Sequence, residues 1–243
     1  MFSVGGITSP FLTIMEAAKT NLTNHITCPI GNILGYALSS DGILLSQFSS
    51  HELFPLREEI NNMMRVPEEY TDAAPGLAGH IEKEYDISPI VNEYLETLVM
   101  PVANQYIESY PNYLKKFNIL SAPLKLYLHN SWVNFQKKYE FQPLHNHNGV
   151  FSFVIWMQIP YNSEIEKSQP WAVRSNCPCP GEFEIFCLDT TGGLRSEKIP
   201  VDKRYENHIL FFPSAMYHAV YPFYTSDDYR ISISGNIKLK VPE

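Results

Sequence analysis

The sequence of 243 residues contains few charged side chains and no long run of basic or apolar residues. Lys and Arg number 18 against 26 Asp and Glu, which gives a net charge of −8 at pH 7. An acidic chain repels phosphate backbones, and no Lys/Arg run supports a local basic patch, so we do not expect nucleic acid as a partner. No stretch approaches the roughly 18 apolar residues of a membrane span, so we do not expect a membrane partner either.

Cysteine is also scarce, with Cys28 remote in sequence from Cys177, Cys179 and Cys187. This distribution is a poor disulfide framework for a chain of this length. A zinc site would need a fourth ligand from Cys28 or His208, and a plain reduced loop is the favoured interpretation.

The first apolar stretch, residues 1–15, has no basic residues at its start and contains Pro10 and two glycines. It therefore lacks the pattern of a secretory signal. Together with the cysteine usage, this pattern predicts a cytoplasmic protein.

The patterning differs between the two halves of the chain. Residues 1–120 hold the helical signals, over Pro55–Met64 and Ser88–Phe117, and Pro101 is expected to kink or split the second helix. Asn32–Phe48 has the pattern of a β-hairpin. We therefore expect a mixed, largely helical N-terminal region packed on a separate core.

Residues 121–243 instead contain short aromatic and β-branched segments bounded by Gly, Pro, Asn or Asp. Such segments indicate a β-sandwich or barrel, and a jelly roll is one way to close it. The fold class predicted is α+β, with a double-stranded β-helix (jelly-roll, cupin-like) core. The expected strands are Leu124–Gln136, Gly149–Pro160, Glu182–Leu188, His208–Pro213 and Tyr229–Leu239.

Three histidines and an arginine lie in this β half in an order that suits a metal centre. His145 and His147, two residues apart on a strand-like segment, point to the same side, and His218 from a distant strand completes one face of an octahedron. The opposite face stays open, as non-haem Fe(II) oxygenation requires. Arg230, twelve residues after His218, can bind a carboxylate bidentately, and Ser232 lies on the same face of that strand.

A single histidine is more often structural than a metal ligand, so the prediction depends on these residues taken together. The spacing by itself also allows zinc or another metal of cupin-type sites.

The region from Trp132 to Asn236 resembles the phage and bacterial 2-oxoglutarate/Fe(II) oxygenases that are distantly related to prolyl hydroxylases. The matching segments are SWVNFQKKYEFQPLHNHNGVFSFVIWMQIPY, ILFFPSAMYHAVYPF and YRISISGN. The resemblance covers somewhat under half of the chain.

The resemblance implies that His145 is the first iron ligand, His218 the distal ligand, and Arg230 the partner of the far carboxylate of 2-oxoglutarate, supported by Ser232. Most of that superfamily has His-x-Asp or His-x-Glu, and here His147 occupies the carboxylate position. We favour a three-histidine site. The alternative is that His147 is the first ligand and that Gly149 leaves a vacancy.

A buried ligand carboxylate needs several hydrogen-bond donors. Tyr127 and Asn134 are therefore candidates for binding 2-oxoglutarate, although ordinary strand positions explain them equally well.

The resemblance implies a 2-oxoglutarate- and Fe(II)-dependent dioxygenase that hydroxylates a C–H bond and releases succinate and CO2. Its substrate would be a protein, a peptide or a small molecule, and a homodimer is conceivable. Two other interpretations remain open. One is a three-histidine cupin-type metalloenzyme that does not use 2-oxoglutarate, and the other is a catalytically silent jelly-roll binding module.

Overall fold

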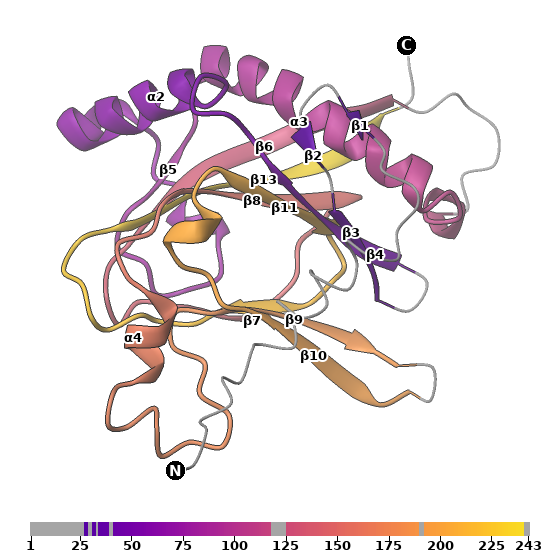
Figure 1. The fold of residues 1–243 in the computed structure, drawn as a ribbon. Coiled ribbons are helices and arrows are strands. Elements are labelled where there is room, and N and C mark those ends of the chain that lie inside the picture. Colours follow the sequence, from indigo (N-terminus) through magenta and orange to yellow (C-terminus); the bar gives the residue numbers. More distant parts are fainter. Residues whose placement is uncertain are drawn as a thin grey trace.

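The structure is a computed structural model that describes residues 41–117, 125–189 and 192–240, and the backbone of short strands at 27–28, 31–32 and 34–38. Two antiparallel β-sheets make up most of the regular secondary structure of these residues, and the helices lie outside the sheets (Figure 1). No helix in this part of the chain is long and apolar enough to cross a membrane.

The larger sheet has seven strands in the order β3-β4-β11-β8-β13-β6-β5. Its strands are β3 (Leu34–Leu38), β4 (Asp41–Gln47), β5 (Glu84–Asp86), β6 (Lys125–Gln136), β8 (Phe151–Gln158), β11 (His208–Pro213) and β13 (Arg230–Lys240).

The smaller sheet has the order β10-β9-β12-β7. Its strands are β7 (Gln142–His145), β9 (Phe183–Leu188), β10 (Leu194–Ile199) and β12 (His218–Val220), and β1 (Thr27–Cys28) and β2 (Gly31–Asn32) form a separate pair.

The two sheets stack face to face through a shared apolar layer. Val154 and Phe212 of the larger sheet pack there with Phe183 and Ile185 of the smaller one. Because side chains alternate across a strand, each strand of the larger sheet presents one row to this interior and the other row to the helices. This two-layer arrangement places the polar row of β13 between the sheets.

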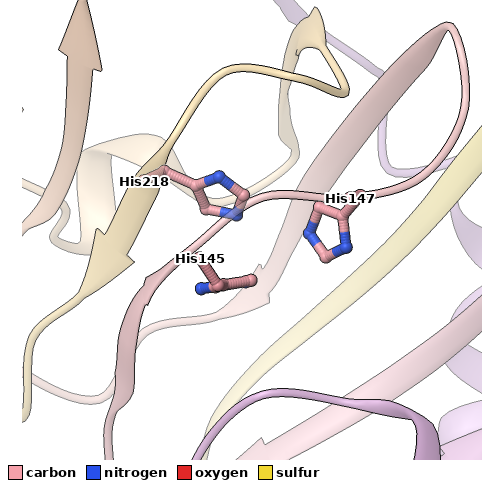
Figure 2. Close-up of side chains that lie close together, drawn as sticks. All are labelled: His145, His147 and His218. Carbon is pink, nitrogen blue, oxygen red and sulfur yellow. The ribbon is translucent and has the colours of Figure 1, made fainter.

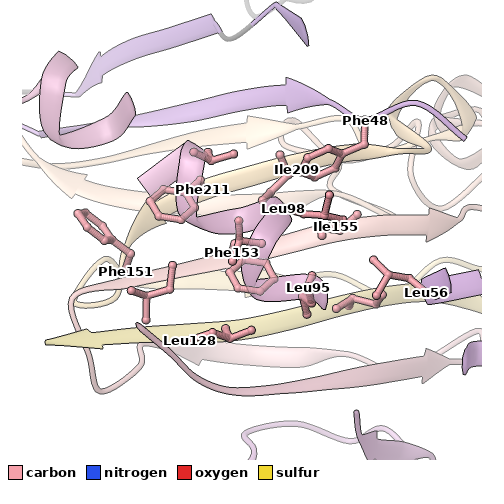
Figure 3. Close-up of a cluster of buried hydrophobic side chains, with 14 of the residues drawn as sticks. Phe48, Leu56, Leu95, Leu98, Leu128, Phe151, Phe153, Ile155, Ile209 and Phe211 are labelled. Carbon is pink, nitrogen blue, oxygen red and sulfur yellow. The ribbon is translucent and has the colours of Figure 1, made fainter. Parts of the chain in front are cut away.

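Two helices cover the outer face of the larger sheet. α2 (Phe54–Arg65) and α3 (Pro89–Ser109) lie above it, and Leu95 and Leu98 of α3 pack on Phe153 and Ile155 of β8 (Figure 3). Burying each such side chain contributes about 1.5–3 kcal/mol. The predicted split at Pro101 is wrong, because α3 continues through this residue and ends at Ser109.

Short helical segments complete the described chain. These are α4 (Ser163–Lys167) and the 3-10 turns η1 (Pro67–Glu69), η2 (Ala74–Gly76), η3 (Leu114–Phe117) and η4 (Lys203–Tyr205).

The first 120 residues contribute strands to the larger sheet as well as helices. β4 pairs with β11, and β5 pairs with β6. The expected hairpin corresponds to β3 and β4, which pair with one another, although residues 39–40 lie outside the described part. The N-terminal region is thus joined to the core by backbone hydrogen bonds, which the helical patterning did not indicate.

Candidate metal and cosubstrate site

The three predicted histidines come together at one end of the smaller sheet. His145 is the last residue of β7 and pairs directly with His218, the first residue of β12. His147 lies in the turn after β7, where its backbone N–H donates to the Ser214 carbonyl. The side chains converge (Figure 2), and one ligand atom of each lies within 4.8 Å of the others.

Backbone carbonyls orient two of the three rings. Nδ1 of His145 lies 2.7 Å from the Pro143 carbonyl oxygen, and Nδ1 of His218 lies 3.1 Å from that of Met216. A carbonyl only accepts, so each Nδ1 carries the proton and each Nε2 keeps a free lone pair for a metal. His145 and His218 can therefore each offer Nε2 to a metal ion.

The histidines are held in their neutral form. Burial lowers the pKa of His147 to about 4, and it also lowers the pKa of His145 and takes that of His218 well below its ordinary value. The neighbouring imidazoles add to the effect at His147 and His218. Neutral imidazole is the form that binds a metal.

Arg230 lies in the same pocket at the first position of β13 and is only 3% exposed. Its Nε and Nη2 both donate to Gln136 Oε1, at 3.1 and 2.5 Å. Nη1 donates to the Tyr161 hydroxyl and the Gly181 carbonyl, and Nη2 also donates to the Tyr221 carbonyl. All four acceptors are neutral, and no carboxylate among the described residues forms an ion pair with this guanidinium.

A buried cation without a counter-ion is costly. Its position inside the pocket therefore suits an anionic ligand. Gln136 already places one oxygen against the Nε/Nη2 edge, where a carboxylate would place two.

Polar side chains fill the space between Arg230 and the histidines. Asn134, 3% exposed, donates to the hydroxyls of Ser232 and Ser234 and accepts from the Trp132 indole at 3.1 Å. The residues that line the pocket are Leu77, Ala78, Ile81, Trp132, Asn134, Gln136, Gln142, His145, His147, Phe153, Val154, Trp156, Phe183, Phe212, His218, Val220, Arg230, Ser232 and Ser234.

Two candidate groups from the sequence are not brought to this pocket. Tyr127 lies seven residues from Asn134 on β6, about 23 Å at ~3.3 Å per residue, and it does not line the pocket. The cysteines do not join a metal cluster within the described residues, where only the three histidines qualify. Cys177, Cys179 and Cys187 are free thiols, and the side chain of Cys28 lies outside the described part.

The sequence interpretation gave no role to Gln136 or Tyr161. Gln136 is paired with Arg230 across β6 and β13, so strand register could have identified it. Tyr161 and residues 77–81, of which Leu77, Ala78 and Ile81 line the pocket, come from segments distant from Arg230 in the sequence. His80 of this segment bridges to Phe141 beside β7 and so ties it across the pocket.

Comparison with known proteins agrees with this geometry. Residues 130–236 match the sequence model of the family described as "Putative 2OG-Fe(II) oxygenase". This segment is similar to the 2OG-Fe(II) oxygenase family. The match spans the strand pair β6–β13 and includes all three histidines and Arg230, so the resemblance and the dioxygenase class expected from the sequence are confirmed.

Several solved structures of 2OG-Fe(II) oxygenases and related proteins are similar to this chain at low identity. A prolyl-4-hydroxylase from Pseudomonas putida is 15% identical with a TM-score of 0.47, and the alignment covers 80% of this chain and 91% of that one. HygX from Streptomyces hygroscopicus, solved with nickel, 2-oxoglutarate and hygromycin B, is 13% identical with a TM-score of 0.43, covering 82% and 83%.

A 2OG-Fe(II) oxygenase family protein from Burkholderia pseudomallei is 12% identical with a TM-score of 0.36, covering 93% and 78%. A search of curated protein sequences gives no match.

The pocket fits the cofactors of this family. Three neutral imidazoles suit Fe(II), and the buried, uncompensated Arg230 suits the far carboxylate of 2-oxoglutarate. The departure from the usual pattern is His147, which stands where most members have a carboxylate.

Proposed function

We propose that this 2OG-Fe(II) oxygenase has a double-stranded β-helix core in which His145, His147 and His218 hold the iron. The observation that carries the proposal is the convergence of three neutral imidazoles in one pocket with a buried arginine. The Nδ1 contacts of His145 and His218 leave Nε2 as their ligand atom. A vacancy at Gly149 is the less favoured alternative, because His147 already lies with the other two rings.

Arg230 is the proposed partner of the far carboxylate of 2-oxoglutarate. The carboxylate would replace Gln136 Oε1 at the Nε/Nη2 edge, while the Tyr161 hydroxyl and the Gly181 carbonyl keep the guanidinium in place. Ser232 and Asn134 lie between this end and the histidines and are the nearest further hydrogen-bonding groups. Tyr127 is too far along β6 to share this role.

Fe(II) and 2-oxoglutarate, when bound, supply oxidative decarboxylation to succinate and CO2 coupled to hydroxylation of a substrate C–H bond. The chain supplies position and a dry environment. Trp132, Phe183 and Phe212 surround the imidazoles with apolar rings, and Phe183 stacks on His218 at 5.3 Å. These rings cover part of His147 and His218 with apolar surface. The substrate is proposed to be a protein, a peptide or a small molecule, and the protein to act in the cytoplasm.

Three neutral ligands leave the metal centre one unit more positive than two histidines and a carboxylate. We therefore expect weaker retention of Fe(II) by the chain but stronger attraction of a dianionic cosubstrate. The lack of a carboxylate among the three proposed ligands and the positive charge of Arg230 both favour the binding of a dianionic cosubstrate.

The test is calorimetric titration of anaerobic, Fe(II)-loaded protein with 2-oxoglutarate. We expect micromolar binding that disappears without iron and in His218→Ala. His129→Ala is the matched control, because His129 is an exposed histidine outside the pocket. If the iron-loaded wild-type protein does not bind 2-oxoglutarate, the proposal fails.

A further inference from the structure

The polar row of β13 extends beyond the pocket. Positions 230, 232, 234, 236, 238 and 240 share one face of the strand, because every second side chain points the same way. The first three line the pocket. Asn236 follows and is 7% exposed, and the last two positions are Lys238 and Lys240. The other row, including Ile231, Ile233 and Ile237, is buried under the helices.

β6 continues the same face beside it. Trp132 pairs with Ser234, Asn130 with Asn236, Tyr127 with Lys238 and Lys125 with Lys240, and His129 is the extra residue at the β-bulge. Five side chains therefore gather at the far end of this strand pair. We call them the lysine face: Lys125, Tyr127, His129, Lys238 and Lys240.

The lysine face gathers three positive charges on an acidic protein. Within the described part of the chain no carboxylate lies at ion-pair distance from its three ammonium groups. Lys240 Nζ lies 5.4 Å from the centre of the Tyr127 ring, and the rings of Tyr127 and His129 meet edge to face at 6.0 Å. Lys125, His129 and Lys240 are exposed. Aromatic and cationic groups thus share one accessible surface.

This surface adjoins the metal site on the side away from Arg230. The rings of Trp132 and His147 are 5.9 Å apart, so Ser234, which pairs with Trp132, marks the level of the histidines. Lys238 is four residues further along β13, about 13 Å, and Lys240 about 20 Å.

The turn that carries His147 continues to Gly149, which lies directly against this end of the strand. A Cβ there would be 2.9 Å from the Ile237 carbonyl oxygen and 3.7 Å from Lys238 Cγ. Lys238 therefore packs beside the loop that holds the metal.

We propose that the lysine face binds an acidic, extended peptide segment of the substrate, about four residues from the residue that is oxidised. The inference rests on the proposed function, because it assigns the substrate class of the same site. Lys238 and Lys240 lie roughly 6.6 Å apart, which is also the spacing of alternate side chains in an extended peptide. Carboxylates at alternating positions of that peptide can meet both ammonium groups, and Tyr127 provides apolar contact.

The charge balance favours a short acidic peptide over a nucleic acid. A chain of net charge −8 repels a long polyanion at every approach. Three lysines offset only a few phosphates, whereas two or three carboxylates match them.

The experiment is fluorescence anisotropy with a labelled peptide of about twelve residues that carries three alternating glutamates at one end. We expect binding by wild-type protein at low ionic strength that weakens about tenfold in Lys238→Gln/Lys240→Gln. The matched control is Lys138→Gln/Lys203→Gln, which removes the same charge. Lys138 forms an ion pair with exposed Asp227. Lys203 is also exposed, and it lies 35 residues before Lys238 in the sequence. The control should bind as wild type does.

A second peptide tests whether a segment bound to the lysine face runs toward the three histidines. It carries a histidine about four residues from the nearest glutamate, and its affinity should rise when Fe(II) is added, since one molecule then binds at two places. No rise would show that the peptide does not run toward the iron and would overturn the assignment as a substrate surface.

Equal loss of binding in both double variants, or no binding by wild type, would also overturn the proposal. Tighter binding of a single-stranded oligonucleotide of equal charge would replace the acidic peptide with a phosphate ligand. 2-Oxoglutarate binding should be unchanged in Lys238→Gln/Lys240→Gln. If wild type binds the peptide but not 2-oxoglutarate, the proposed function fails and a peptide-binding surface remains.

Discussion

The two ends of β13 carry cations on the same face of one strand, and their surroundings differ completely. Arg230 at the first position is buried, and all of its N–H groups donate to protein oxygens. Lys240 at the last position is exposed, and its ammonium group lies 5.4 Å from the centre of the Tyr127 ring. The stacked smaller sheet covers one end and leaves the other open.

The comparison shows that burial assigns the role of each cation. A buried guanidinium must be fully hydrogen-bonded and gains most from an anion held inside the protein. Exposed ammonium groups lose little by staying unpaired and act over a solvated surface. One end therefore suits a small, enclosed cosubstrate and the other suits part of a larger substrate.

Removing the buried cation should have the largest effect. Arg230→Met removes the donors to the oxygens of Gln136 and Tyr221 and one of the two donors to the Gly181 carbonyl, so we expect a loss of about 3–5 kcal/mol of unfolding free energy. Urea denaturation measures this loss, and calorimetry should detect no 2-oxoglutarate binding by the folded fraction. Arg57→Met is the control, because Arg57 also donates to a carbonyl, that of Met157, but lies outside the pocket. Retained 2-oxoglutarate binding in Arg230→Met would contradict the assignment.

Pairing Arg230 with a carboxylate of the protein should test whether its positive charge is what binds 2-oxoglutarate. In Gln136→Glu the new side chain has the same shape as the glutamine and would place a carboxylate against the Nε/Nη2 edge of Arg230. This carboxylate would compete with the carboxylate of 2-oxoglutarate for the guanidinium. We expect the Kd for 2-oxoglutarate to rise about 100-fold, about 2.7 kcal/mol, with Fe(II) binding unchanged. Gln142→Glu, which also adds a charge to the pocket but does not contact Arg230, should weaken binding less. An equal effect of both substitutions would point to general repulsion instead.

A buried carboxyl near the pocket provides the opposite case. Glu84 on β5 is 3% exposed, its Oε1 has no hydrogen-bond partner, and burial raises its pKa to about 7. The folded chain then binds this proton more tightly than the unfolded chain does. The contribution of Glu84 to the free energy of unfolding is therefore most favourable below pH 4.5, and it is lost as the pH rises through about 7.

Glu84→Gln should therefore stabilise the protein by about 2 kcal/mol at pH 8 and flatten this decline. Urea denaturation at pH 5 and pH 8 provides the measurement. Glu82→Gln, at an exposed neighbouring position, should change neither value. An unchanged slope between pH 5 and 8 in Glu84→Gln would show that this carboxyl titrates normally.

The smallest effect on stability is expected at the exposed end. Lys238→Gln/Lys240→Gln should change the free energy of unfolding by less than about 0.5 kcal/mol, because no described carboxylate pairs with either ammonium group. Urea denaturation beside Arg230→Met gives the direct contrast. A loss similar to that of Arg230→Met would mean that the lysines support the fold.

Much of the site could be predicted because it depends on short spacings. Arg230 and Ser232 share a strand face through side-chain alternation. His145 and His147 are only two residues apart, so they stay close although His147 lies in the turn after β7. Asn134 lies in the pocket beside Ser232, and its contact with 2-oxoglutarate stays a prediction. Tyr127 lies about 23 Å from Asn134 along β6 and does not line the pocket.

The sequence by itself predicted β6, β8, β9, β11 and β13, the order of the candidate ligands and the family resemblance, because side-chain alternation and local motifs are written in consecutive residues. It did not predict the short strands β7, β10 and β12. Only the tertiary structure decided what surrounds each cation. Gln136, Tyr161 and Gly181 reach Arg230 from three separate segments, and Lys125 reaches Lys240 across two strands more than a hundred residues apart. The acidic net charge argued against a basic patch, yet strand pairing assembled one, because register joins residues that no run of sequence contains.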